Sequence, residues 1–149
     1  MRLWHYLLIP YLPKSQLLAQ WRELNSIFKK QDKHILINYI YEYPKNDLEI
    51  YTLMVISEME KRNFSILNLQ KAIFYFNWSD TFVYKYLPSL KNADIKLKPF
   101  ENHHTYRYLR QCYYNLQEKY DRGQKDFSEE LYDKLDQLMC IKFYEENPF

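Results

Sequence analysis

The sequence predicts an all-α fold, a single compact domain of about five helices around an aromatic-rich core. Gly123 is the only glycine among 149 residues, so tight hairpins and glycine loops are poorly supplied. The 16 Tyr and 9 Phe residues provide many large side chains for a core. No Pro-, Gly- or Ser-rich linker divides the chain, and its length suits one core. Residues 1–149 are therefore expected to form one domain.

The first predicted helix has Ser15 as its candidate N-cap. After Ser15, apolar residues recur at helical spacing and form one stripe: Leu17, Leu18, Trp21, Leu24 and Phe28. Arg22 and Glu23 fall beside or off this stripe, so we expect them to face a groove or solvent. Residues 34–41 have β-branched and aromatic character but no convincing partner strand, which favours an extended or helical core segment.

A second helix is expected from Asn46 to about Arg62. Asn46 and Glu49 have capping-box spacing, and Asn63 is suited to end the helix. A third helix is expected to begin near Ser65.

The second half of the chain predicts two more helices. Residues 77–86 fit neither a helix nor a strand period and stay open, and Pro88 and Pro99 bracket a basic connection. A helix follows over about 102–119, with Gly123 in the turn after it. The last helix is expected to be capped near Asp126 or Ser128.

Charged residues are segregated along the chain. Residues 1–34 hold six Lys and Arg against two Asp and Glu, and residues 85–125 hold nine against four. Residues 126–149 hold two Lys and Arg against seven Asp and Glu. This distribution can create a basic face for a polyanion, although unevenly charged, solvated helices would give the same count.

Several classes of protein are disfavoured. Cys112 and Cys140 lack the spacing of a disulfide framework or a zinc knuckle, and the adjacent pair His103-His104 has no third ligand at helical spacing. Leu7-Leu8-Ile9 is too short for a signal peptide, and no stretch approaches the length of a membrane span. We therefore expect a cytoplasmic protein, associated with the nucleoid if it binds DNA, without a metal, a cofactor or a membrane partner.

The first 34 residues carry a specific resemblance. Met1-Arg2-Leu3-Trp4, a helix with Arg22-Glu23-Leu24, and Lys33-His34 together resemble the pyrimidine-dimer DNA glycosylase family, the phage-type endonuclease V. Arg62-Asn63-Phe64 is similar to the family's Arg-Gly-Phe turn, with Asn63 in place of glycine. The resemblance covers residues 1–76, whereas residues 77–149 form a divergent part expected to be helical.

The resemblance implies a DNA repair enzyme with glycosylase and AP lyase activities on damaged double-stranded DNA, acting as a monomer. In the family the α-amino group attacks the sugar C1′, forms an imine and prepares strand cleavage by β-elimination. Met1 and Glu23 would be the catalytic residues, with Glu23 stabilising positive charge and moving protons. An α-amine suits the first task because it is less basic than lysine. Arg2, Arg22, Lys33 and His34 would bind DNA.

The family's enzymes expose a small residue after the initiator methionine is removed. Arg2 is bulky and predicts that Met1 is retained here, and Ser26 replaces a further basic position of the family. Either the Met1 amine still reaches the sugar, or lyase chemistry is lost or passes to a side chain such as Lys14.

Two other functions stay open. The chain could be a non-catalytic helical DNA-binding module that keeps the basic face, or a protein-interaction domain that uses the acidic tail from Asp126 to Phe149. Single residues also have ordinary structural interpretations. An exposed Arg-Glu ion pair on a helix usually contributes little to stability. Tryptophans such as Trp4 and Trp21 are more often core aromatics than wedges inserted between bases.

Overall fold

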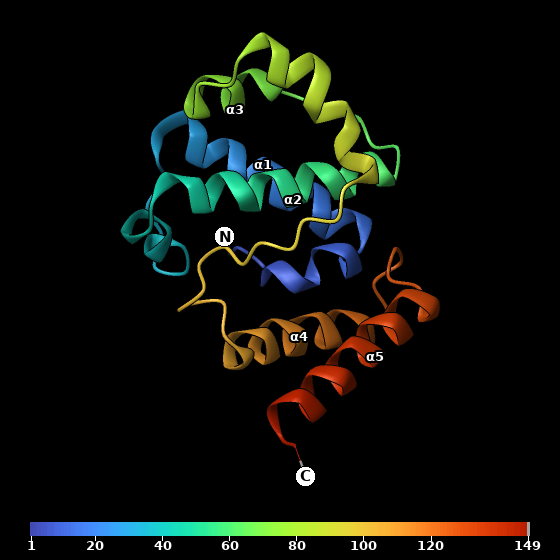
Figure 1. Cartoon of the computed structure of the whole chain (residues 1–149). Helices are drawn as coiled ribbons and strands as arrows, with labels where there is room; N and C mark the ends of the chain where they lie inside the picture. Colours follow the sequence, from blue (N-terminus) through green and yellow to red (C-terminus); the bar gives the residue numbers. More distant parts are fainter. Residues whose placement is uncertain (149) are drawn as a thin grey trace.

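The structure, a computed structural model, describes residues 1–148 and is helical, which confirms the all-α prediction (Figure 1). No strand occurs in this part of the chain. The α-helices are α1 (Lys14–Lys30), α2 (Lys45–Lys61), α3 (Leu69–Phe76), α4 (Tyr106–Asp121) and α5 (Glu129–Glu146). Short 3₁₀ helices are η1 (Tyr6–Tyr11), η2 (Asn38–Glu42) and η4 (Leu87–Asn92), and η3 (Phe82–Tyr86) is a π-helical turn.

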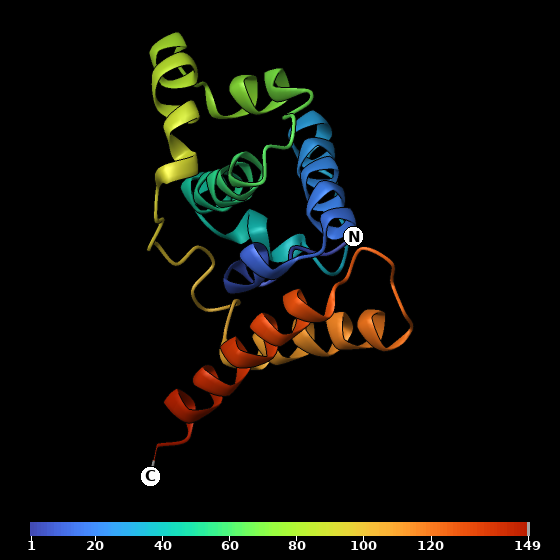
Figure 2. The same ribbon diagram turned by 90° about the vertical axis from the view of Figure 1, so that its right-hand side faces the viewer.

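The amino-terminal segment and η1 lie between two groups of helices. On one side α1 contacts α2 and α3, and α2 contacts η1. On the other side α4 and α5 pair with each other and both contact η1, as Figure 2 shows. Fully buried side chains from all these layers, among them Leu3, Leu17, Tyr51 and Leu116, form one hydrophobic cluster. The amino-terminal segment is therefore enclosed by helices from both halves of the chain.

The predicted cap of the first helix is wrong. Pro13 occupies the N-cap position of α1, and Ser15 lies inside the first turn. The Ser15 backbone N–H donates instead to Asp126 Oδ2 at 2.7 Å. A carboxylate at this position satisfies a free N–H group and favours the positive end of the helix dipole. The cap of α1 thus comes from the loop before α5, more than a hundred residues away in the sequence.

The predicted capping box of the second helix is also wrong. Pro44 precedes α2, no side chain caps it, and Glu49 accepts a hydrogen bond from Trp78 Nε1 at 2.9 Å. The end of this helix was predicted correctly, because Asn63 adopts a left-handed conformation with φ 61°. Asparagine tolerates this conformation better than most residues, which explains how it can stand in for glycine.

Three later boundaries differ in detail. The third helix begins at Leu69 instead of near Ser65, because Asn68 is left-handed. The fourth begins at Tyr106, where the Thr105 side chain accepts from the Tyr108 N–H at 3.3 Å. The predicted Ser128 cap of the last helix is confirmed.

Residues 34–41 are helical and not extended. They form a turn followed by η2. Ile37, Tyr39 and Ile40 are buried, whereas Ile35 and Leu36 are exposed, so the predicted core segment is confirmed only in its second part. Across residues 1–148, the structure contains no helix with the length and apolar character needed to cross a bilayer. Phe149, the last residue of the acidic tail, lies outside the described residues.

Candidate active site

The backbone at the amino terminus is attached to α1 by Gln20. This side chain is fully buried, and its Nε2 donates to the Arg2 carbonyl and to Glu23 Oε2, both at 3.1 Å. Its Oε1 accepts from the Trp4 N–H at 2.9 Å. One amide group therefore joins the first residues of the chain directly to the Glu23 carboxylate.

Tyr51 from α2 contacts both the amino-terminal backbone and Gln20. It is completely buried, and its hydroxyl lies 2.6 Å from the Trp4 carbonyl oxygen and 2.9 Å from Gln20 Oε1. Because a hydroxyl has one proton, it can donate to only one of these acceptors at a time. Burial holds the pKa of Tyr51 well above its usual range, so the hydroxyl keeps that proton.

The Glu23 carboxylate is half-buried and lies within electrostatic reach of the amino terminus. Burial raises its pKa, and several neighbours act in the opposite direction: the terminal amine, a hydrogen bond from the Arg2 N–H, and the charges of Arg22 and His34. The terminal amine has the largest effect among these neighbours. Glu23 is therefore a half-buried carboxyl with a raised pKa beside a primary amine, a pairing suited to proton exchange with the groups around it.

Arg2 contributes to the site through its backbone and turns its side chain elsewhere. Its guanidinium lies near Cys112 and Tyr108 of α4, and it lowers the pKa of both groups. Burial raises the pKa of Cys112, which keeps this buried cysteine in its thiol form. The structure thus brings the Arg2 N–H, and not its guanidinium, to Glu23.

Three predicted DNA-binding residues are exposed. Arg22 follows Trp21 on α1, and both Arg22 and His34 lower the pKa of Glu23. The His34 ring also holds its own turn, since Nδ1 accepts from the Leu36 N–H at 3.2 Å. Lys33 lies beside His34 on the exposed surface.

Lys14 lies far from Glu23. The two residues are nine positions apart on the same helix, which separates them by about 14 Å along its axis. The Lys14 ammonium lies over the Phe64 ring, 5.3 Å from its centroid. The alternative in which Lys14 replaces the terminal amine is therefore disfavoured by position.

Two buried histidines attach the amino-terminal segment to the loop before α4. The Leu7 N–H donates to His5 Nδ1 at 3.1 Å, so His5 Nε2 carries the proton and donates to the His104 carbonyl at 2.9 Å. The Tyr6 N–H donates to His104 Nδ1 at 3.2 Å, so His104 Nε2 can donate to the Tyr39 hydroxyl at 2.7 Å. Backbone donors thus fix both tautomers.

The same network continues to the backbone of Leu3. Tyr39 is hydrogen-bonded to Tyr108, and the Tyr108 hydroxyl donates to the Leu3 carbonyl. Burial lowers the pKa of His5 to about 4 and that of His104 to about 2, so both rings are neutral at neutral pH. His5 therefore has a structural role here.

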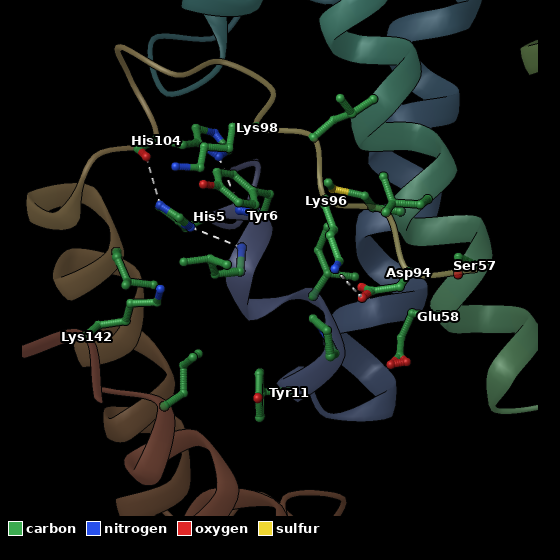
Figure 3. A pocket seen from close by; sticks show the side chains of 18 of the residues that line it. His5, Tyr6, Tyr11, Ser57, Glu58, Asp94, Lys96, Lys98, His104 and Lys142 are labelled. Atoms are coloured by element: carbon green, nitrogen blue, oxygen red, sulfur yellow. Dashed lines mark hydrogen bonds and ion pairs between the residues drawn. The ribbon is translucent and has the colours of Figure 1, made fainter. Parts of the chain in front are cut away.

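A cavity bordered by both halves of the chain lies away from this site. It measures about 600 Å³ and is bordered by η1, α2, the 93–98 segment and α5, with His5, Tyr6, Lys96 and Lys142 on its walls (Figure 3). Neither Met1 nor Glu23 lines it. Within residues 1–148, no cluster of three or more His, Cys, Asp or Glu side chains could hold a metal ion.

The sequence interpretation missed the residues that hold the site together. Gln20 lies three positions before Glu23 and therefore on the same helix face, which was a usable signal. Tyr51 and Tyr108 gave no such signal, because their partners are backbone carbonyls distant in the sequence. Trp4 and Trp21 are 8% and 4% exposed, so their interpretation as core aromatics is confirmed.

Comparison with known proteins agrees with this geometry. The family model described as pyrimidine dimer DNA glycosylase matches residues 1–71. Searches of curated proteins and of solved structures gave no match. The matched region contains Met1, Gln20, Glu23 and His34, and it ends before α4 and α5. The first 71 residues thus carry the sequence pattern of the pyrimidine dimer DNA glycosylase family, which confirms the family that the sequence resembles.

Proposed function

We propose that the protein is a DNA glycosylase with AP lyase activity, using the amine of Met1 and the carboxylate of Glu23. The family match supports the coarser assignment, a glycosylase that acts on DNA. The proposed substrate is a damaged nucleotide in double-stranded DNA, and a pyrimidine dimer is the damage that the family description names. Residues 1–149 are proposed to act as one domain and as a monomer.

The proposed reaction begins with attack of the amine nitrogen on C1′ of the damaged nucleotide. The bond from C1′ to the base breaks, the base leaves with the electron pair and gains a proton, and the nitrogen loses protons as the sugar opens to an imine. Removal of a proton from C2′ then expels the 3′ phosphate and cuts the strand. Water hydrolyses the imine and releases the amine. Glu23 stabilises the positive charge and carries the protons.

One observation carries the proposal: Gln20 Nε2 donates both to Glu23 Oε2 and to the Arg2 carbonyl, so the residue next to Met1 is tied to the carboxylate before a substrate arrives. The terminal amine is also among the groups that lower the pKa of Glu23. Preorganisation of this kind supports catalysis because little rearrangement remains for the reaction itself.

Exposed basic residues around Glu23 and after α1 support DNA as the ligand. Arg22, Lys33 and His34 are proposed to contact phosphates. The backbone of Arg2 hydrogen-bonds Glu23, so this residue contributes to the site mainly by holding the carboxylate. Phosphate contacts release counterions, so binding should weaken steeply as the salt concentration rises.

The test is borohydride trapping on a duplex with one abasic site. The proposed enzyme forms a covalent adduct that resists EDTA and is lost in Glu23→Gln and after chemical blocking of the terminal amine. Because many basic proteins nick abasic DNA slowly, the comparison with Glu23→Gln carries more weight than wild-type activity alone.

The same experiment separates the other two functions. Salt-sensitive DNA binding without an adduct would indicate a non-catalytic binding module. Failure to retard DNA at low salt would favour an interaction domain that uses the acidic tail.

A further inference from the structure

The turn after α1 presents an unusual side chain to solvent. Ile35 is 86% exposed and Leu36 is 41% exposed, although the next residue, Ile37, is completely buried. A large aliphatic side chain exposed to this extent contributes almost none of the free energy that its burial would add to the fold. Two adjacent exposed aliphatics at the tip of a turn therefore suggest an external partner.

The turn is held firmly on both sides of Ile35. The His34 N–H donates to Asn38 Oδ1 at 2.8 Å, and the His34 carbonyl accepts from the N–H groups of Ile37 and Asn38 at 2.8 and 2.9 Å. Before the turn, the Tyr41 hydroxyl donates to the Asp32 carbonyl. Because the turn is braced in this way, Ile35 is displayed on a rigid support.

Charge near the turn identifies the kind of partner. Arg22, Lys29, Lys30 and Lys33 are exposed on α1 or directly after it, and Asp32 is the only acid among residues 29–33. His34 precedes Ile35 and acts on Glu23. A hydrophobic tip that directly follows Lys33 and His34, within electrostatic reach of Glu23, is complementary to a duplex, whose phosphates are anionic and whose base stack is apolar.

We propose that Ile35, supported by Leu36, inserts into the base stack of duplex DNA next to the damaged nucleotide. This inference rests on the proposed function and names one of its contacts. An apolar wedge separates neighbouring bases, kinks the duplex and helps the nucleotide leave the stack. Trp4 and Trp21 cannot serve as the wedge, because both are buried in the core.

Leu67 and Phe74 are two further strongly exposed apolar side chains near α1, at 67% and 89% exposure. Leu67 lies between Ile66 and Asn68 and Phe74 between Ile73 and Tyr75, whereas Ile35 follows directly after Lys33 and His34. The adjacent charge thus favours Ile35 as the DNA contact.

The test compares duplex and single-stranded DNA, because a wedge is needed only where bases are stacked in a duplex. Single-turnover cleavage of an abasic site is measured on both substrates for wild type, Ile35→Ala and Ile141→Ala. Ile141 lies on α5 and is 57% exposed, so it is a matched substitution outside the turn. We expect Ile35→Ala to lower the duplex rate about 10-fold, to leave the single-strand rate unchanged, and Ile141→Ala to alter neither.

Two results would overturn the wedge. One is a duplex rate for Ile35→Ala equal to that of wild type. The other is an equal loss on both substrates, which would mean that Ile35 supports the active site itself.

A second measurement separates the wedge from the proposed chemistry. A 2-aminopurine placed beside the abasic site should brighten when wild type binds and should respond much less to Ile35→Ala, and this signal needs no bond cleavage. If wild type brightens the probe in an Ile35-dependent way but forms no adduct, the proposed chemistry is contradicted and the role of Ile35 as a wedge is supported. A wild type that cleaves without brightening the probe would do the opposite.

Discussion

The two halves of the chain contribute to the site in different ways. Residues 1–71 match the family and contain Met1, Gln20 and Glu23. Residues 72–148 lie beyond that match, yet Tyr108 and His104 bind the backbone of Leu3 and Tyr6. The half that matches the family contains Met1 and Glu23, which are proposed to react, and the other half holds the segment that begins with the terminal amine.

The contacts from the two halves alternate along the amino-terminal segment. Gln20 binds the Arg2 carbonyl and the Trp4 N–H from within the matched region. From outside it, the hydroxyl of Tyr108 binds the Leu3 carbonyl between them. A family pattern that ends at residue 71 thus leaves out part of what positions the amine, and the following experiments test this dependence.

The largest effect is expected from removing the unmatched half. A chain ending at Phe76 loses α4 and α5, both of which contact η1, and exposes the apolar side chains that they cover, such as Leu8. We expect this fragment to show no cooperative thermal unfolding by circular dichroism and to form no borohydride adduct. A fragment that unfolds cooperatively and is trapped like the full chain would show that the site is independent of the second half.

Lowering the pH should destabilise the contact between the two halves, because it protonates His5 and His104. Below pH 6.5 the unfolded chain binds protons on His5 and His104, whereas the folded protein takes them up only near pH 4 and pH 2. The free energy of unfolding therefore decreases as the pH is lowered, by about 1.4 kcal/mol per pH unit for each histidine. Urea unfolding between pH 7 and 5 measures the slope, and His104→Gln should reduce it by one histidine. An unchanged slope in that variant would contradict the assignment.

Gln20→Leu tests the clamp inside the matched region. It leaves the Trp4 N–H and the Arg2 carbonyl without their partner, at a cost of about 2–4 kcal/mol in unfolding free energy. The adduct yield should fall as well, because Gln20 no longer ties the Arg2 backbone to Glu23. Gln137→Leu, on the exposed surface of α5, is the control and should alter neither quantity. A stable Gln20→Leu protein with wild-type trapping would disprove the clamp.

Tyr108→Phe removes a single hydroxyl from the junction and should have the smallest effect. The loss of its hydrogen bonds to Leu3 and Tyr39 is expected to cost about 1–2 kcal/mol, with a modest decrease in trapping rate. Tyr114→Phe makes the same change at an exposed position of the same helix and should be neutral. If both variants behave alike in urea unfolding and trapping, the hydroxyl of Tyr108 does not hold the segment.

Helical character was predictable because it depends on local patterns. The apolar stripe of α1 and the left-handed Asn63 that ends α2 both follow from sequence spacing and residue type. The caps predicted at Ser15 and Asn46 failed, because prolines precede both helices and a distant carboxylate, that of Asp126, serves the first. A cap supplied by a residue so distant in the sequence cannot be recognised from local spacing.

The site was partly predictable for the same reason. Met1 and Glu23 came from a resemblance, and Gln20 could have been found from its position on the same helix face. The turn of the Arg2 side chain toward Cys112 could not, because it depends on where α4 packs. Backbone acceptors such as the Leu3 carbonyl exist at every residue, so the sequence does not distinguish the one that Tyr108 selects.

The most direct test of the central claim is to identify the atom that carries the trapped sugar. After borohydride reduction on abasic DNA, cleavage following Glu23 releases residues 1–23 as one peptide, which holds both the Met1 amine and Lys14. Fragmentation in the mass spectrometer then separates these two positions. The account predicts that the added mass lies on the α-amino group of Met1. A sugar attached to Lys14, or to any other lysine side chain, would contradict it.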